Sequence, residues 1–169
     1  MFVSSIVCVL VPRFELVVAA GGRAGLLGGP AALAPEPGRE QKVGEVSEAA
    51  EGFGIHAGMR MGEALARCPR LALVPPDPLG VADAWERVLE RLEAMGARVE
   101  PGRPGLACFD ARGLRRLHGG SLDGVLAATR AALSSPVRLA PRAERERASG
   151  TVRLGAGSSR FCAIVTTSQ

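Results

Sequence analysis

The sequence lacks tyrosine altogether and has a single lysine, Lys42, so that arginine accounts for nearly all of its positive charge. Because this skew is typical of a GC-rich coding bias, we do not interpret it as an arginine code. The net charge of +4 and the pI of about 9.4 permit contact with a polyanion but do not require it. Charge therefore does not select a function class.

No apolar run is long enough to cross a membrane. The N-terminal stretch MFVSSIVCVLVPRFELVVAA is interrupted by Pro12, Arg13 and Glu15, well short of the ~20 residues that a span needs. A signal peptide requires basic residues ahead of its apolar run, and this stretch has none there. These features predict a cytoplasmic protein without a membrane segment.

The four cysteines show no CxxC or Cys/His spacing, which argues against a zinc site. Each lies among apolar residues. We therefore expect Cys8, Cys68, Cys108 and Cys162 to be small buried hydrophobic residues with free thiols in a reducing compartment, with metal or disulfide roles as the less favoured alternatives.

The remaining composition is typical of a globular protein, with 47% hydrophobic and 22% charged residues over 169 positions. SIVCVLV at 5–11 predicts a strand buried on both faces. Further strands are expected at 31–34, 42–47, 97–100, 106–111, 137–140 and 152–154. Helices are expected at 14–27 (or an irregular crossover), 47–53, 81–95, 122–133 and 158–165, with a helical turn at 113–120 and a charged loop or helical turn at 141–150. This alternation predicts a mixed α/β or α+β domain with a single sheet.

Three blocks carry a resemblance to a known family. GIHAGMRMGEALARCPRLALVPPDP at 54–78 resembles the fingers segment of the UmuC-like, or Y-family, translesion DNA polymerases. LACFDARGLRRLHGG is similar to their palm strand and the turn after it, and VRLGAGSSRFCAIVTT to the segment that follows. The resemblance implies an α+β fold with a palm-like sheet, flanking helices and a small fingers subdomain.

The same resemblance sets the expected domain organisation. Residues 1–169 form one palm-plus-fingers module, with the fingers at approximately 30–78 inserted between palm segments 1–29 and 79–169. We expect no thumb and no little-finger domain in this chain.

The family's metal ligands are replaced. Nucleotidyl transfer needs carboxylates that hold divalent ions, and the family places the first of them on the opening strand. The equivalent places here hold Val9, Val11, Pro12 or Arg13. The second pair, anchored on Phe109 and Asp110, falls at Gly105 and Leu106. We therefore expect no catalytic residues, no metal and no cofactor.

The family's triphosphate clamp, a tyrosine and an arginine, falls at Glu48 and Glu51. Two carboxylates at these places would repel a triphosphate. Asp110 is expected to cap the following turn rather than to bind a metal. The candidate contacts to nucleic acid are Arg60, Arg153 and Arg160, the last of which matches a family lysine.

The leading hypothesis is a non-catalytic Y-family polymerase-like protein with an accessory or scaffold role in DNA repair and translesion synthesis. Its expected partners are DNA, bound weakly, and an active DNA polymerase, the sliding clamp or another repair protein. One alternative is an active, divergent polymerase or nucleotidyltransferase with relocated carboxylates. The other is a Rossmann-like nucleotide-binding protein, because LVVAAGGRAGLLGG is rich in glycine.

Overall fold

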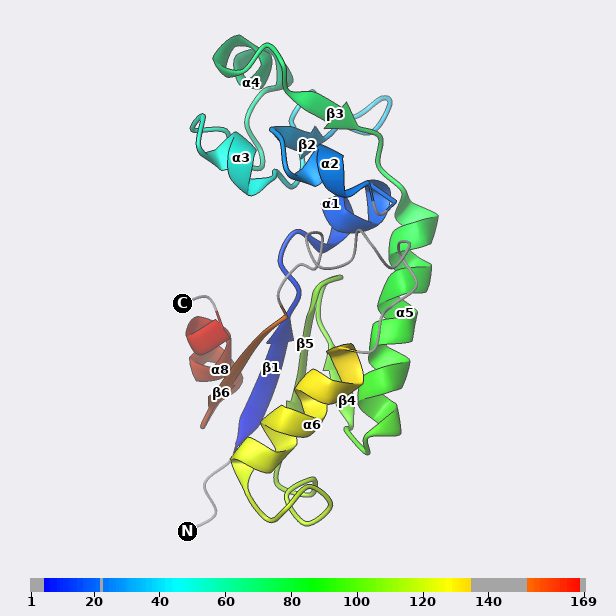
Figure 1. The fold of residues 1–169 in the computed structure, drawn as a ribbon, viewed down its shortest axis with the longest axis vertical. Coiled ribbons are helices and arrows are strands. Elements are labelled where there is room, and N and C mark those ends of the chain that lie inside the picture. Colours follow the sequence, from blue (N-terminus) through cyan, green and yellow to red (C-terminus); the bar gives the residue numbers. More distant parts are fainter. Residues whose placement is uncertain (1–4, 22, 135–151, 168–169) are drawn as a thin grey trace. The chain divides into compact units, whose positions relative to one another are not determined.

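A computed structural model describes residues 5–21, 23–134 and 152–167 of the chain (Figure 1). Their contacts divide them into two compact units. The described residues of unit 1 are 5–12, 83–134 and 152–167, and those of unit 2 are 13–21 and 23–82. The expected strand at 137–140 and the charged loop at 141–150 lie outside the described residues.

Unit 1 is built on a four-stranded sheet with the order β4-β5-β1-β6, in which every neighbouring pair is antiparallel. Its elements are β1 (Ile6–Leu10), most of α5 (Pro78–Ala94), β4 (Val99–Pro101), β5 (Leu106–Asp110), α6 (Leu122–Ser134), β6 (Arg153–Gly157) and α8 (Arg160–Thr167). The fold is therefore mixed α and β, as predicted, but the expectation of a single sheet is wrong, because residues 31–33 and 72–74 form a second one. A Rossmann fold places the glycine-rich turn directly between a parallel strand and the helix that follows it. Here the stretch 16–29 begins inside the helix Phe14–Ala19, and the strand before it is antiparallel to both of its neighbours, so the Rossmann alternative does not fit.

Strand β1 is the centre of the sheet, with β5 on one side and β6 on the other. Val7, Cys8 and Val9 are each 0% exposed, which confirms the prediction of a strand buried on both faces. Since side chains alternate between the two faces, Cys8 shares one face with Cys108, where Ala163 and Ile164 of α8 pack against them. Buried apolar residues elsewhere in unit 1 come from Phe109 and from helices α5 and α6, among them Val88, Leu92 and Val125.

Helix α5 begins three residues earlier than the amphipathic pattern predicts. The Oδ1 atom of Asp77 accepts a hydrogen bond of 2.9 Å from the backbone N–H of Gly80, and Pro78 is the first helical residue. An aspartate cap followed by proline is a favoured helix start, because proline has no N–H to leave unpaired.

Among the described residues, no helix is long and apolar enough to span a membrane.

Unit 2 surrounds a two-stranded parallel sheet formed by β2 and β3. Its elements are α1 (Phe14–Ala19), α2 (Ala24–Leu27), β2 (Ala31–Leu33), α3 (Glu48–Glu51), α4 (Met61–Arg67), β3 (Ala72–Val74) and the start of α5. Residues 13–29 group with this unit through contacts such as those of Leu16 with Ala31, Leu33 and Val74. The fingers-like segment 54–78 thus forms a helix and a strand that are part of one small domain.

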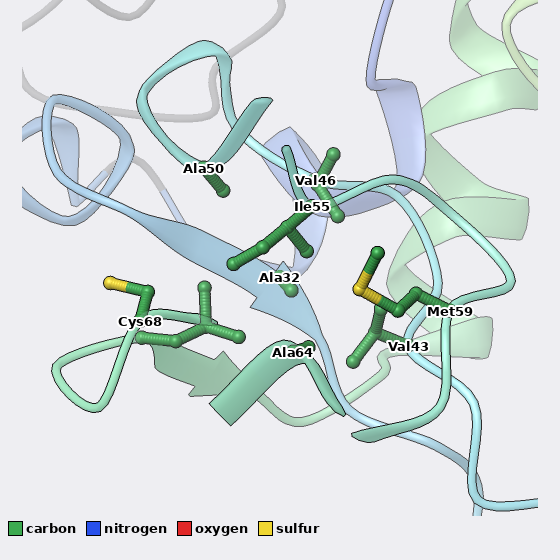
Figure 2. Close-up of a cluster of buried hydrophobic side chains, with 9 residues drawn as sticks. Ala32, Val43, Val46, Ala50, Ile55, Met59, Ala64 and Cys68 are labelled. Atoms are coloured by element: carbon green, nitrogen blue, oxygen red, sulfur yellow. The ribbon is translucent and has the colours of Figure 1, made fainter. Parts of the chain in front are cut away.

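The core of unit 2 is a cluster of small and medium-sized apolar side chains (Figure 2). Ile55 and Met59, from the turn before α4, point into this cluster together with Val43 and Val46 from the segment before α3. The returning strand expected at 42–47 is reduced to two isolated bridges, Ala32 with Val46 and Lys42 with Arg60. Gly44 makes the close approach possible, because a Cβ atom there would lie 2.9 Å from Cβ of Leu33.

Two cysteines form a bond that the sequence analysis did not favour. Cys8 and Cys108 are directly opposite each other in the β1–β5 register and form a disulfide across 100 residues of sequence. The prediction of free thiols is therefore wrong for these two residues. It is confirmed for Cys68, which is buried, whereas Cys162 lies outside the disulfide but is exposed rather than buried. Strand pairing between distant segments decides which cysteines meet, and spacing along the chain does not reveal it.

We expect reduction of the Cys8–Cys108 bond to destabilise unit 1, because a cross-link over a long loop restricts the unfolded chain by about 2–4 kcal/mol. For a chain of this length, that corresponds to a decrease in Tm of about 5–15 °C. Thermal denaturation with and without a thiol reductant measures it. Cys162→Ser is the control and should retain the full difference, whereas an equal Tm in both conditions would contradict the prediction.

Candidate functional site

The candidate site is the end of the unit 1 sheet where β1 finishes and β5 begins. Leu10 pairs with Leu106, and the N–H of Val11 donates a hydrogen bond of 2.8 Å to the carbonyl of Gly105. The two places where the resemblance puts metal ligands are thus adjacent in space, although about 95 residues separate them along the chain. On the other side of β1, Arg153 pairs with Leu10.

This end of the sheet does not fit a magnesium site. Mg²⁺ requires oxygen ligands in near-octahedral geometry, with carboxylates as the usual protein donors. The side chains present are aliphatic or absent, from Val9, Val11, Gly105 and Leu106, and Arg153 adds a positive charge at the same end. Within residues 5–21, 23–134 and 152–167, no three histidine, cysteine, aspartate or glutamate side chains are grouped so that they could hold a metal.

Asp110 lies at the opposite end of the same sheet. It pairs with Ile6 at the start of β1, four residues along the strand from the Leu10–Leu106 pair, a separation of ~13 Å. Its Oδ1 atom accepts a hydrogen bond of 2.9 Å from the N–H of Arg112, and Oδ2 accepts one of 2.7 Å from Nε of Arg112. The expectation that Asp110 caps the turn is confirmed.

The Arg112 side chain also sets the protonation behaviour of Asp110. Its hydrogen bond to the carboxylate is the main cause that holds the pKa of Asp110 below the ordinary 3.8. Burial acts in the opposite direction, and the backbone N–H of Arg112 and the charges of Arg112 and Arg115 lower the pKa further. A carboxylate with this partner stays ionised over the whole physiological range.

We expect the carboxyl group of Asp110 to titrate below pH 3.8 in the folded protein and to return toward 3.8 in Arg112→Gln. Since the folded pKa is depressed, the stability that this pair contributes is present above about pH 4 and disappears as the pH falls through the folded pKa. NMR titration of the side-chain carboxyl carbon measures both midpoints. A wild-type midpoint at or above 3.8 would show that the ion pair does not form.

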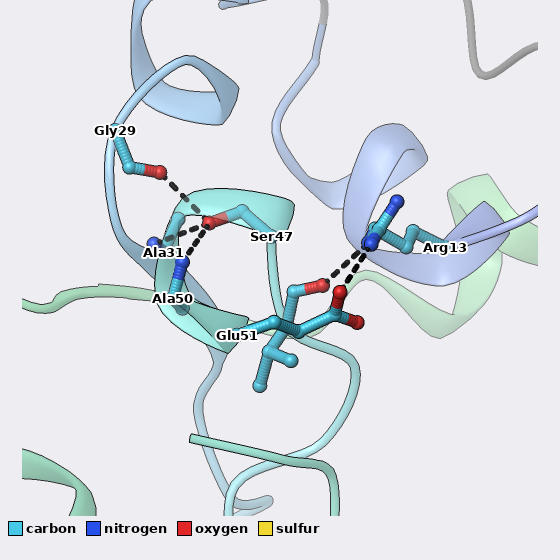
Figure 3. A network of polar contacts seen from close by, with 7 residues as sticks. Arg13, Gly29, Ala31, Ser47, Ala50 and Glu51 are labelled. Carbon is cyan, nitrogen blue, oxygen red and sulfur yellow. Dashed lines mark hydrogen bonds and ion pairs between the residues drawn. The ribbon is translucent and has the colours of Figure 1, made fainter. Parts of the chain in front are cut away.

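In unit 2, Arg13 and Glu51 form an ion pair (Figure 3). The resemblance expects a carboxylate near the position of Arg13 and an arginine at the position of Glu51. Nη2 of Arg13 lies 2.8 Å from Oε2 of Glu51, and Nε of Arg13 donates a hydrogen bond of 2.8 Å to the carbonyl of Val46. Arg13 stands among the candidate positions for a metal-binding carboxylate, and Glu51 at a triphosphate-binding position. The two replacements neutralise each other within the chain.

Arg13 adopts a backbone conformation that costs energy. Its φ of 54° is left-handed, and it is the one non-glycine residue with positive φ in the part of the chain that the structure describes. Left-handed backbone is unfavourable for a residue with a Cβ atom, so the contacts to Val46 and Glu51 hold Arg13 in place against this cost. Glu48, the other clamp position, is the exposed first residue of α3.

Ser47 places Glu48 and Glu51 on the surface by capping α3, as predicted (Figure 3). Its Oγ atom accepts hydrogen bonds from the N–H groups of Ala50 at 3.2 Å and Ala31 at 2.9 Å, and it donates one of 2.8 Å to the carbonyl of Gly29. Ser47 is 2% exposed, and Ala31 and Ala50 are fully buried. One hydroxyl therefore joins α3 to β2.

We expect Ser47→Ala to lower the free energy of unfolding by about 2–4 kcal/mol, because it removes a helix cap and leaves the N–H of Ala31 buried without a partner. Urea denaturation measures this loss. Ser134→Ala is a matched control, since the exposed Ser134 hydroxyl donates only to the carbonyl of Arg130 in its own helix. Its effect should stay within about 0.5 kcal/mol, and an equal effect of the two variants would contradict the proposed role of Ser47.

The three predicted nucleic-acid contacts fall in both units. Arg60 is the exposed N-cap residue of α4 in unit 2. Arg153, also exposed, begins β6 in unit 1, and Arg160 begins α8 and forms an ion pair with Glu100 of β4. That pair reduces the charge that Arg160 can offer to a phosphate. Whether any of the three binds nucleic acid stays a prediction.

Two pairings in the structure were not predicted from the sequence. Arg13 and Glu51 are 38 residues apart, and only the reversed charge at both positions hinted that they meet. Arg70 lies over the ring of Phe53, with its guanidinium carbon 5.6 Å from the ring centroid. The signal for the second pairing was the isolated aromatic in Gly52-Phe53-Gly54, because a large apolar side chain between two glycines has little local cover.

The antiparallel sheet of unit 1 and the helix–turn–strand domain of unit 2 define a palm-and-fingers fold of the Y-family DNA polymerase type. Residues 10–168 match the impB/mucB/samB family, so the chain belongs to this family. No curated protein sequence matches it. The solved structures with a similar fold include DinB from Sulfolobus solfataricus, with a TM-score of 0.78. They also include an insertion ternary complex of the Dbh DNA polymerase, with a TM-score of 0.77.

Both relatives are 17% identical to this chain, and in each case 97% of this chain aligns with 45% of the other. A second DinB-family error-prone DNA polymerase from Sulfolobus solfataricus aligns with a TM-score of 0.71, again at 17% identity, over 97% of this chain and 44% of the other. The chain thus spans less than half of the length of these polymerases. At such low identity, the similarity shows the fold alone.

Proposed function

We propose that this chain is a non-catalytic member of the Y-family polymerase group that acts as an accessory or scaffold protein in DNA repair and translesion synthesis. The observation that carries the proposal is the end of the sheet at Leu10 and Leu106. In an active polymerase of this family, these two strands would carry the carboxylates that hold the metal ions. Here the strands pair at Leu10 and Leu106, and the described side chains at this end are aliphatic, apart from Arg153. Two-metal phosphoryl transfer requires that cage.

The pair formed by Arg13 and Glu51 supports the same proposal independently. In an active enzyme, cations on the protein and bound metal ions offset the charge of the triphosphate. Here Arg13 is engaged by Glu51, and Glu48 adds a second exposed carboxylate on the same helix. A triphosphate at α3 would therefore meet the exposed carboxylate of Glu48, and Arg13 would not be free to bind it.

The described aspartates do not support the alternative of a divergent active enzyme. Asp77 caps α5 and Asp110 caps the turn after β5. Asp83 and Asp123 belong to the helices α5 and α6, and no grouping with other potential ligands occurs in the described segments. Relocated carboxylates would have to converge, and these four serve separate parts of the fold.

Under this proposal, the protein interacts with DNA and with an active polymerase, the sliding clamp or another repair protein. The similar structures include polymerases in insertion and post-insertion complexes, which supports an association with DNA. Arg60 and Arg153 are the proposed contacts, with a smaller share from Arg160. A cytoplasmic location stays a prediction from the sequence.

We expect the purified chain to add no nucleotide to a primed template with Mg²⁺ or Mn²⁺, and to show no Mg²⁺-dependent heat of dNTP binding in titration calorimetry. Calorimetry is the stricter test, because it needs only the palm and fingers portions. Glu51→Gln is the matched variant: it releases Arg13 from its ion pair but supplies no metal ligand, so it should show no Mg²⁺-dependent dNTP binding either. Primer extension, or Mg²⁺-dependent binding by either protein, would overturn the proposal.

A further inference from the structure

Phe53 is a large apolar side chain that unit 2 leaves on its surface. It is 40% exposed, whereas Ile55 and Met59 from the same turn are buried at 1% and 4%. Gly52 and Gly54 flank it, so neither neighbour has a side chain that could cover the ring. An exposed aromatic ring on a surface that also carries exposed arginines has the chemistry of a contact to unpaired bases.

The turn that carries Phe53 is held by its own hydrogen bonds. The N–H of Phe53 donates to the carbonyl of Ala50 at 3.0 Å, and the N–H of Gly54 to that of Glu51 at 2.8 Å. Arg67 of α4 donates from Nη1 to the carbonyl of Gly54 at 2.9 Å and pairs with Glu63 through Nη2. Gly54 has φ +71°, and a Cβ atom there would lie 2.8 Å from Nη1 of Arg67. The turn that carries the Phe53 ring is therefore fixed to α4 by a hydrogen bond.

Arg70 extends this surface. Its guanidinium carbon lies 5.6 Å from the centroid of the Phe53 ring, within the range of a cation–π contact. The side chain of Arg70 is exposed, as is that of Arg60 at the start of α4. Neither forms an ion pair with any residue in the described part of the chain. The Arg67 side chain, by contrast, is already used to hold the turn.

The local charge favours a polyanion. Residues 52–70 contain three arginines, one glutamate and no aspartate, a net charge of +2 with His56 neutral. The glutamate, Glu63, is paired with Arg67 at 2.9 Å, and Glu51 before the turn is paired with Arg13 at 2.8 Å. Glu48, at the other end of α3, is an exposed carboxylate. The unpaired charges next to the ring are thus mainly positive.

We propose that Phe53 and Arg70 form a stacking platform for a base of single-stranded nucleic acid, with Arg60 contacting its backbone phosphates. Aromatic rings and guanidinium planes stack on unpaired bases, and cations along the path of the backbone bind its phosphates. A duplex keeps its bases stacked inside and offers none to the ring. An acidic peptide would use the arginines but gain nothing from Phe53. The proposal rests on the DNA association in the proposed function, but not on the absence of catalysis.

We expect the full chain to bind a fluorescein-labelled dT20 oligonucleotide more tightly than a duplex of the same length, as measured by fluorescence anisotropy at 50 mM salt. Phe53→Ala should weaken binding of dT20 by about 5- to 150-fold, because stacking on one aromatic contributes ~1–3 kcal/mol per base, and should leave duplex binding nearly unchanged. Arg70→Gln should weaken dT20 binding and reduce the dependence of log K on log salt by about 0.7. Arg70→Lys, which keeps the charge but not the planar group, should recover only part of the loss.

Phe53→Trp supplies a direct readout of stacking. A base on the new indole should quench its fluorescence, whereas wild-type Trp85 is 8% exposed and should not respond. Leu79→Ala, which removes an 80% exposed apolar side chain elsewhere in unit 2, and Arg39→Gln in the loop after β2 are the matched controls and should bind dT20 like wild type. Circular dichroism melts confirm that each variant is folded.

The outcomes that overturn the proposal are distinct from those of the primer-extension and calorimetry tests. No binding of dT20 at 50 mM salt, equal binding by wild type and Phe53→Ala, or an absence of quenching in Phe53→Trp would each contradict it. If a polyglutamate peptide competed as effectively as unlabelled dT20, the surface would recognise negative charge alone. The surface would then be assigned to an acidic protein partner. A chain that binds dT20 but also extends primers would keep this site and remove the non-catalytic function.

Discussion

The antiparallel register of β1 with β5 is the constraint on which unit 1 depends. It places Cys8 opposite Cys108, where they form the disulfide, and it brings Val11 next to Gly105 at one end of the sheet. The same register sets Asp110 at the other end, opposite Ile6. Since a shift by one residue would turn every side chain to the other face, any other register would separate Cys8 from Cys108.

Unit 2 depends on a different kind of interaction. Its sheet has only two short strands, which would be marginal alone. The Ser47 hydroxyl joins α3 to β2, and the apolar cluster around Ile55 and Met59 joins the turn before α4 to both (Figures 2 and 3). A domain held in this way can keep its shape while its surface residues change. Glutamates at positions 48 and 51, where the resemblance expects a tyrosine and an arginine, are therefore compatible with the fold.

Local patterns predicted most of the elements. The β-branched run in β1, the apolar stripe of α5 and the Ser47 cap are signals within a few residues of each other, and the structure has all three. The helical turn at 113–120 is also present, as hydrogen-bonded turns that end in Gly119 and Gly120, both with φ +75°. The returning strand at 42–47 depends on distant partners and forms only isolated bridges. The start of α5 was misplaced for a local reason, because the Asp77-Pro78 cap lies outside the apolar periodicity.

For the candidate site, the sequence by itself determined which side chains are available: no carboxylate on the opening strand, glycine and leucine at the second pair of positions, and glutamates in place of a triphosphate clamp. Tertiary structure alone decided which of these residues meet. The pairing of Cys8 with Cys108, of Arg13 with Glu51 and of Phe53 with Arg70 each joins residues 17 or more positions apart. The physical reason is that composition and periodicity report local conformation and burial. Contacts between distant residues follow from strand register and domain packing, which no short stretch of this chain specifies.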